Sequence, residues 1–398
     1  MLSSRAKNLK TSPTLFLVAK AKELSAQGHD VISLTVGEPD WPTYPAAAEA
    51  GINAIKSGFT KYTAANGMIE LRQAISEKLK FELGQDYPVK NIMVGPGAKF
   101  VIFSALQMLC DRGDEVIIHS PYWVSYPTMA ELADGVPKIV TCGENEGFKI
   151  TAEQLEKAIT PKTKVFLFCS PSNPTGFVYS RTELERMAAV LRKHPQIVVI
   201  SDDMYNRLMF DGSKVAPHLL QVAPDLKERV VAVNGGSKAY SMTGWRIGWA
   251  AGPSHLIQAM GDYQSQSTGA PSSIAQQAAL AALKNCEPQI AETNQLLLKR
   301  LKLAKEAFAK IPEFKVFDPQ GAFYLWVDIS KVIGRRYDNK KIEGSKDFSE
   351  ILLSKFFVAT VPGAEFGNEG YLRLSFATSE KRFAEAVDRM ADLVNQCL

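Results

Sequence analysis

Residues Lys164–Cys169 read KVFLFC, and two more short apolar runs follow along the chain: Ile197–Ser201 (IVVIS) and Arg229–Asn234 (RVVAVN). All three are rich in β-branched or aromatic residues, which is typical of strands buried on both faces of a sheet. The stretch Arg181–Lys193, between the first two runs, has the hydrophobic period of a helix. Strands that alternate with helices in this way predict an α/β fold with a mainly parallel sheet.

Four further strand-like runs extend the expected sheet to seven strands: Asn91–Val94, Glu115–His119, Lys138–Thr141 and Ile247–Ala251. Helical-period stretches, such as Ala98–Cys110 and Thr151–Ile159, lie between several of these runs. The middle of the chain therefore predicts one large sheet covered by helices on both faces.

Both ends of the chain have a different pattern. A helical piece and an extended piece open the chain, at Leu15–Gln27 and Val31–Val36. The C-terminal part mixes helices and strands at Glu287–Lys310, Phe314–Phe317, Gly321–Val327, Tyr371–Phe376 and Glu380–Asn395. We therefore expect a large domain of residues 46–289 and a smaller α+β domain formed by both chain ends, residues 1–45 and 290–398.

Composition narrows the class of protein. The 398 residues are 46% hydrophobic and carry a net charge of only +4, so we expect no nucleic-acid partner. The five cysteines are odd in number and form no Cys-x-x-Cys pair, so neither a disulfide framework nor a metal site is expected. No apolar run reaches membrane-spanning length and the first residues do not resemble a secretory signal. We expect a cytoplasmic protein that does not contact membranes.

Polar side chains follow three neighbouring strands of the expected sheet. Asn173 comes after the first run, Asp202 and Tyr205 after the second, and Ser237 and Lys238 after the third. Ligands of parallel α/β sheets bind beyond the carboxyl ends of the strands. The sequence thus predicts a binding site at this edge.

Lys238 has two interpretations. Most lysines are solvated surface residues. Small neighbours such as Gly235 and Gly236 and a nearby cation, Arg246, instead favour a lysine with a depressed pKa that attacks carbonyl groups.

The other rim residues also have two interpretations each. Asp202 could cap the next helix, or its carboxylate could keep a pyridine nitrogen protonated. Tyr205 could simply pack, or it could bond a ring hydroxyl. Asn173 precedes Pro174, which by itself signals a turn.

A candidate phosphate site precedes these residues in the chain. Gly97, Ala98 and Lys99 follow a strand and open a helix, where free backbone N–H groups attract phosphate. Ser237 and Arg246 could add a hydroxyl and a bidentate cation. Phe100 stands where a dinucleotide fingerprint needs its third glycine, which disfavours a dehydrogenase.

Two further residues complete the set of candidates. Trp123 follows another strand end and could stack on a cofactor ring or simply pack. Arg373 alternates with Leu372 and Leu374 in a strand, which fits either an exposed strand face or an anchor for a carboxylate. The chain has no P-loop, no Gly-x-Ser-x-Gly elbow and no His-x-x-x-His spacing.

Several motifs together resemble one family along nearly the whole chain: Val36–Asp40, Lys61–Tyr62, Ser120–Pro127, Asn173–Gly176, Ser237–Gly248 and Tyr371–Ser379. In this order and spacing they are similar to the class I aminotransferases that use pyridoxal 5′-phosphate (PLP), in their bacterial aspartate aminotransferase-like branch. The resemblance implies the PLP-dependent transferase fold type I.

The resemblance also implies roles for the residues. Lys238 would bind PLP as a Schiff base and move the proton during catalysis. Asp202 would pair with the ring nitrogen. The other implied cofactor contacts are Tyr205, Asn173, Trp123, Gly97, Ala98, Lys99, Ser237, Arg246 and, from the partner of a homodimer with shared active sites, Tyr62. The implied substrate contacts are Arg373 and Gly37 at the α-carboxylate, with Trp123 and Asn173, and Lys99, Ser12 and Thr14 at a second carboxylate.

The expected reaction is a ping-pong exchange of an amino group between an amino acid, aspartate first, and 2-oxoglutarate. Prephenate, aromatic amino acids and alanine remain alternative substrates, because Phe100 beside Lys99 departs from the family's common glutamine. A β-lyase of the same fold and a PLP-binding regulator without turnover are the alternative functions. A regulator of that kind usually carries a DNA-binding domain.

Overall fold

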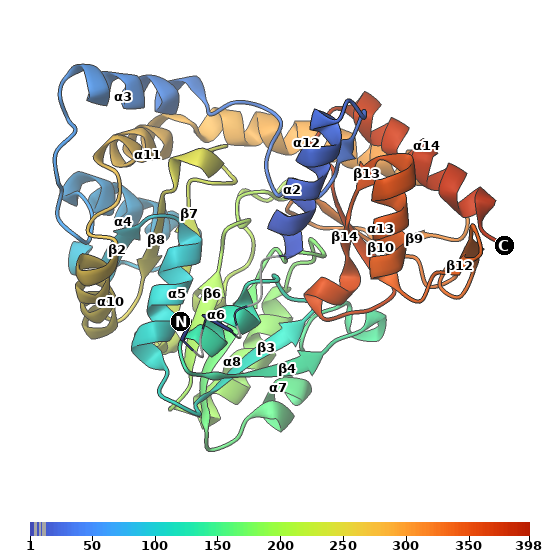
Figure 1. The fold of residues 1–398 in the computed structure, drawn as a ribbon. Coiled ribbons are helices and arrows are strands. Elements are labelled where there is room, and N and C mark those ends of the chain that lie inside the picture. Colours follow the sequence, from blue (N-terminus) through green and yellow to red (C-terminus); the bar gives the residue numbers. More distant parts are fainter. Residues whose placement is uncertain (4–5, 8, 10–12) are drawn as a thin grey trace.

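The computed structural model describes residues 1–3, 6–7, 9 and 13–398 (Figure 1). A seven-stranded sheet dominates the central part of the chain, in the order β2-β8-β7-β6-β5-β3-β4. Its strands are β2 (Ile92–Gly95), β3 (Glu115–Ser120), β4 (Val136–Thr141), β5 (Thr163–Cys169), β6 (Val198–Asp202), β7 (Val230–Gly235) and β8 (Gly248–Ala251). Each lies within two residues of a strand predicted from sequence, so the seven-strand expectation is confirmed.

The sheet is mainly parallel, as expected. Strands β7, β6, β5, β3 and β4 run parallel to one another, whereas β8 pairs antiparallel with both β2 and β7. The carboxyl ends of β5, β6 and β7 consequently lie next to one another, and the loops that follow them share one edge.

Both faces of the sheet are buried. Along β5, Val165 and Leu167 belong to one hydrophobic cluster, whereas Phe166 and Phe168 belong to another on the opposite face. Successive side chains of a strand point to opposite faces, so a strand covered twice must be apolar throughout. This explains why KVFLFC carries no polar alternation.

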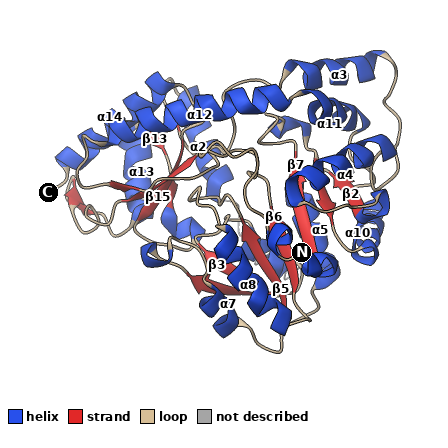
Figure 2. Cartoon of the chain, turned by 180° about the vertical axis from the view of Figure 1, so that it is seen from behind, coloured by secondary structure: helices blue, strands red, loops and turns tan. Residues whose placement is uncertain are grey.

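Helices supply the cover on both faces (Figure 2). Those of the large sheet are α3 (Pro45–Lys56), α4 (Ile69–Leu83), α5 (Ala98–Leu109), α6 (Tyr126–Leu132), α7 (Ala152–Ala158), α8 (Arg181–Lys193), α9 (Leu219–Val222), α10 (Ser254–Ser267) and α11 (Ser273–Asn285). Short 3₁₀ turns connect some of them: η1 (Val89–Asn91), η2 (Glu144–Glu146), η3 (Pro224–Arg229) and η4 (Thr243–Trp245).

A second, four-stranded sheet has the order β14-β15-β10-β9 and is antiparallel. Its strands are β9 (Lys315–Val316), β10 (Tyr324–Asp328), β14 (Val361–Pro362) and β15 (Tyr371–Ser375). The remaining C-terminal elements are α12 (Glu287–Phe308), the hairpin β11 (Arg336–Tyr337) and β12 (Lys340–Lys341), α13 (Ser345–Phe356), β13 (Val358–Ala359), η5 (Gly363–Phe366) and α14 (Glu380–Gln396).

The two ends of the chain meet at this second sheet. Strand β1 (Ile32–Ser33) pairs in parallel with β13, and α2 (Pro13–Ala26) contacts β13 and β14. Figure 1 shows α2, in blue, beside the orange and red C-terminal elements. The division at residues 45/46 and 289/290 itself stays a prediction. Within the part of the chain that the structure describes, no helix is both long and apolar enough to cross a membrane.

Candidate active site

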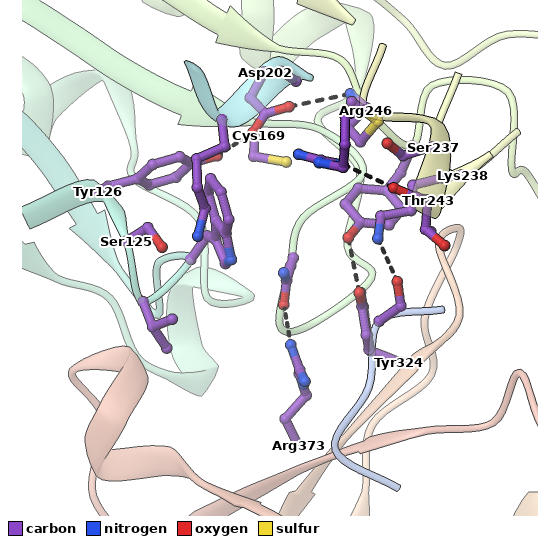
Figure 3. A pocket seen from close by; sticks show the side chains of 18 residues that line it. Ser125, Tyr126, Cys169, Asp202, Ser237, Lys238, Thr243, Arg246, Tyr324 and Arg373 are labelled. Atoms are coloured by element: carbon purple, nitrogen blue, oxygen red, sulfur yellow. Dashed lines mark hydrogen bonds between the residues drawn. The ribbon is translucent and has the colours of Figure 1, made fainter. Parts of the chain in front are cut away.

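A cavity of about 240 Å³ lies where the loops after β5, β6 and β7 face β10 and β15 of the second sheet (Figure 3). Most residues singled out from the sequence line it: Gly37, Ala98, Lys99, Trp123, Asn173, Asp202, Tyr205, Ser237, Lys238, Arg246 and Arg373. The site predicted at the carboxyl ends of the parallel strands thus coincides with a cavity in the structure.

The other singled-out residues lie elsewhere. Gly97 immediately precedes the lining residue Ala98 at the start of α5. Tyr62 is fully exposed and does not line the cavity of its own chain. Ser12 and the side chain of Thr14 lie outside the described part of the structure.

Lys238 projects into the cavity from the loop after β7. Its Nζ donates a hydrogen bond to the carbonyl oxygen of Gly37. Burial, reinforced by the positive charge of Arg373, lowers the pKa of the Lys238 amine to about 8. About a tenth of this amine is therefore unprotonated at pH 7, far more than for an ordinary lysine, and the unprotonated form is the nucleophile.

Asp202 is the last residue of β6 and is buried. Its Oδ2 accepts a 2.6 Å hydrogen bond from the hydroxyl of Tyr126, and its Oδ1 accepts a 3.2 Å bond from the backbone N–H of Met204. Burial raises the pKa of this carboxyl to about 6, although the bond from Tyr126 acts in the opposite direction. The bond to Met204 is a local turn contact and not the helix cap of the simpler interpretation, because the next helix, α9, begins only at Leu219. The carboxylate also faces the cavity (Figure 3).

Arg373 of β15 lines the cavity from the second sheet, and only 3% of this residue is exposed. Its Nη1 donates to Oδ1 of Asn173 at 3.0 Å, and its Nη2 donates to the carbonyl oxygen of Thr35. Among the described residues no acidic side chain pairs with it, and its Nε has no hydrogen-bond partner. A buried cation without a counter-charge is costly, so this arrangement favours an anionic ligand.

The start of α5 forms a cup with Arg246. Gly97 has φ +91°, a backbone conformation that favours glycine, and a Cβ atom there would lie 2.4 Å from Nη2 of Arg246. No side chain caps the first turn of α5, which leaves backbone N–H groups available. Nη1 of Arg246 donates to the carbonyl oxygen of Thr243 at 2.9 Å. Two kinds of donor thus converge as a phosphate group requires.

Lys99 and Trp123 form a further edge of the cavity. Nζ of Lys99 lies 4.9 Å from the centroid of the Trp123 ring. Burial and the nearby charge of Arg246 lower the pKa of the Lys99 amine. Phe100 points elsewhere and stacks on Tyr263 of α10 at 6.3 Å. The aromatic residue that departs from the family pattern therefore does not narrow this cavity.

Several lining residues were not identified from the sequence: Tyr126, Cys169, Met204, Thr243 and Tyr324, with Val124 and Ser125 beside Trp123. Tyr126 lies inside the Ser120–Pro127 motif, so a closer reading of that motif could have found it. Tyr324 has no comparable signal, because one tyrosine in an apolar strand resembles ordinary core. No group of three or more His, Cys, Asp or Glu side chains that could hold a metal ion occurs among the described residues.

Comparison with known proteins gives consistent matches over nearly the whole chain. The family described as aminotransferase class I and II matches residues 29–390. A probable aspartate/prephenate aminotransferase of Rickettsia bellii is 48% identical over 391 residues, with 98% of both chains covered. The solved aspartate aminotransferase of Rhizobium meliloti has a TM-score of 0.95 at 40% identity, with all of both chains covered. The aspartate aminotransferase of Thermus thermophilus with maleate has a TM-score of 0.92 at 39% identity, with 99% of both chains covered.

Proposed function

This chain belongs to the class I and II aminotransferase family, and from that premise we propose that its cavity transfers an amino group from aspartate to 2-oxoglutarate. The cofactor is pyridoxal 5′-phosphate, and the substrates are an amino acid and a 2-oxo acid. The two half-reactions alternate in one site, so both substrates must fit the same cavity.

The residues present fit this cofactor. The cup of Gly97, Ala98, Ser237 and Arg246 matches a phosphate group, and the buried carboxylate of Asp202 matches a protonated ring nitrogen. When bound, the cofactor withdraws electrons from the substrate Cα and makes its proton acidic. Tyr205 and Asn173 would bond the ring hydroxyl oxygen, Trp123 would cover the ring face, and Lys238 would hold the cofactor covalently.

One observation carries the proposal: an amine with a pKa of about 8 lines the same cavity as a buried carboxylate and a buried guanidinium that has no acidic partner among the described residues. Lys238 can lose its proton near neutral pH, so its Nζ can take the proton from the substrate Cα and return it. The carboxylate of Asp202 would hold the positive charge of the cofactor's ring nitrogen in the same cavity. Arg373 fixes the α-carboxylate and so orients the Cα–H bond toward Lys238.

A second carboxylate on the substrate would contact Lys99. This amine has no acidic partner among the described residues and lines the same cavity as Arg373. Two separated cations suit a dicarboxylate, with Ser12 and Thr14 as further contacts. The names of the relatives agree, since they mention aspartate, prephenate and maleate. Prephenate, which also has two carboxylates, is therefore the second candidate substrate.

We also propose a homodimer in which Tyr62 completes the partner's site. Tyr62 is fully exposed in the single chain, although a tyrosine usually buries much of its ring. Apolar side chains nearby in sequence are exposed too: Ile52, Ile55 and Phe59. A partner subunit that covers this surface would explain both facts.

Two further features of the proposal concern the chain as a whole. Residues 46–289 would form the cofactor-binding domain, and residues 1–45 and 290–398 would form the smaller domain that carries Arg373. A cytoplasmic location is supported by the five cysteines, all of which are unpaired.

The function is tested with a panel of amino donors against 2-oxoglutarate: aspartate, arogenate, phenylalanine and alanine. We expect glutamate and the matching 2-oxo acid in equal amounts, with aspartate or arogenate turned over fastest. Ammonia release without glutamate would show a lyase and overturn the proposal. Equal rates for alanine and aspartate would overturn the dicarboxylate assignment alone.

A further inference from the structure

Tyr324 lies against three residues on which the proposed function depends: Tyr205, Arg373 and Gly37. It is the first residue of β10 and only 1% of it is exposed. Its hydroxyl lies 2.8 Å from the hydroxyl of Tyr205, and its ring centroid lies 4.5 Å from Cζ of Arg373. Tyr324 lines the cavity together with Lys238 and Arg373 (Figure 3).

The hydroxyl of Tyr324 is the one hydrogen-bond partner of the Tyr205 hydroxyl within the described part of the chain. A phenol has one proton and two lone pairs. If Tyr324 donates to the oxygen of Tyr205, the proton of Tyr205 stays free to be donated to a ligand. Such a chain of two hydroxyls also strengthens the outer donor, because hydrogen bonds in series polarise one another.

The ring of Tyr324, unlike its hydroxyl, contacts the guanidinium of Arg373. Arg373 carries a buried charge without an acidic partner among the described residues, and Phe366 lies 5.1 Å from its Cζ. The two aromatic rings therefore add to the hydrogen bonds with Asn173 and Thr35 in stabilising this charge. They also hold the guanidinium plane in one orientation before a carboxylate arrives.

Gly37 is coupled to the same residue. A Cβ atom on Gly37 would lie 2.2 Å from Oη of Tyr324 but 3.3 Å from its Cζ. The backbone of Gly37 is not in the left-handed region, so the tyrosine hydroxyl is the principal obstacle to a side chain there. The carbonyl of Gly37 accepts the hydrogen bond of Lys238, so Tyr324 also borders the backbone that holds the lysine.

We propose that Tyr324 is a positioning residue whose hydroxyl holds the phenol of Tyr205 and whose ring holds Arg373. The inference rests on the proposed function, because that function gives Tyr205 and Arg373 their roles. It goes further by assigning two separable effects to one side chain that no motif in the sequence singled out.

The first test separates the hydroxyl from the ring. In Tyr324→Phe, the donor to the cofactor's ring oxygen is weakened, so the pH midpoint of the cofactor's visible absorbance should rise by roughly 0.5 unit. The kcat should fall, whereas the KM for aspartate should stay within about twofold, because the ring remains. In Tyr324→Leu, the KM should also rise, roughly 3- to 30-fold, because the guanidinium of Arg373 no longer stacks on an aromatic ring at position 324.

The matched control is Tyr87→Phe. Tyr87 is also buried, its hydroxyl has no hydrogen-bond partner, and Nζ of Lys227 lies 4.6 Å from its ring centroid. This variant also removes a buried phenol hydroxyl beside a cation, but away from the cavity. We expect neither the absorbance midpoint nor the kinetics to change.

The second test needs no substrate. Gly37→Ala should lower the Tm, and adding Tyr324→Phe should return at least half of the loss, because the clashing oxygen is gone. Additive effects on Tm would overturn the assigned contact. An unchanged absorbance midpoint in Tyr324→Phe would overturn the role of the hydroxyl, even if the Tm falls. The Tm measurement does not depend on turnover. It therefore tests the contact between Gly37 and Tyr324 even if the proposed reaction is wrong.

Discussion

Nη1 of Arg373 donates a 3.0 Å hydrogen bond to Oδ1 of Asn173, and this bond joins the second sheet to the loop after β5 of the large sheet. The two residues are 200 positions apart in the sequence. A substrate carboxylate that binds Arg373 therefore meets a guanidinium already oriented by the other sheet. Pre-oriented donors reduce the entropy lost on binding.

Substitution Arg373→Ala should raise the KM roughly 100-fold for every amino acid donor, because each donor carries an α-carboxylate. Arg373→Lys should recover only part of the loss, since one ammonium cannot form the two parallel bonds of a guanidinium. Steady-state kinetics with aspartate and alanine measure this. A loss confined to dicarboxylates would show that Arg373 contacts the distal carboxylate instead.

Substitution Lys238→Ala should abolish the visible absorbance of the lysine-bound cofactor and nearly all turnover. The amine is the group that holds the cofactor and moves the substrate proton in the proposed reaction. Lys227→Ala is a suitable control, because that partly exposed lysine lies away from the cavity and donates to the backbone of Asp86. If Lys238→Ala keeps the spectrum and the rate of the unmodified enzyme, the proposed function is wrong.

The depressed pKa of Lys238 predicts a specific pH dependence in the protein without cofactor. Only the unprotonated amine reacts with acetic anhydride, so the labelling rate should rise with pH and level off above about 9, one unit beyond its pKa of about 8. A free lysine derivative should continue to gain reactivity at that pH. Mass spectrometry of the peptide that contains residue 238 gives the rate. A profile identical to that of the free derivative would contradict the burial of this amine.

Substitution Lys99→Ala should lower kcat/KM for aspartate roughly 10- to 100-fold and leave alanine and phenylalanine within about twofold. The reason is that Lys99 is a cavity cation without an acidic partner among the described residues. Phe100→Gln is the matched control in the next position. The Phe100 side chain stacks on Tyr263 rather than lining the cavity, so we expect no change in donor preference.

The sequence predicted the large sheet well because its signal is local. A run such as Lys164–Cys169 must be apolar throughout when both faces are covered, and that constraint is visible in a few consecutive residues. The pairing of β1 with β13 was not predictable in the same way, since residues 32–33 and 358–359 meet only through the folded chain. Two-residue strands also carry too little periodicity to be recognised.

The same contrast holds for the site. Asp202 and Lys238 were found because they follow strands whose carboxyl ends must meet. Tyr324 was missed because it lies in a strand of the second sheet, and nothing in its surroundings in the sequence shows which residue faces the cavity. Contacts between the two sheets depend on how they pack together, which local patterns do not encode.

The shared active site predicts complementation between two damaged subunits. Tyr62→Ala should weaken cofactor binding, and Lys238→Ala should prevent its covalent attachment. If Tyr62 serves the partner's site, a mixed dimer contains one site with both defects and one intact site. Random pairing after co-expression then leaves about one quarter of all sites intact, with the cofactor affinity of the unmodified enzyme. Titration with pyridoxal phosphate at limiting concentration counts these sites. If Tyr62 instead acts within its own chain, every site that keeps Lys238 in a mixed dimer lacks Tyr62, and no high-affinity fraction should form.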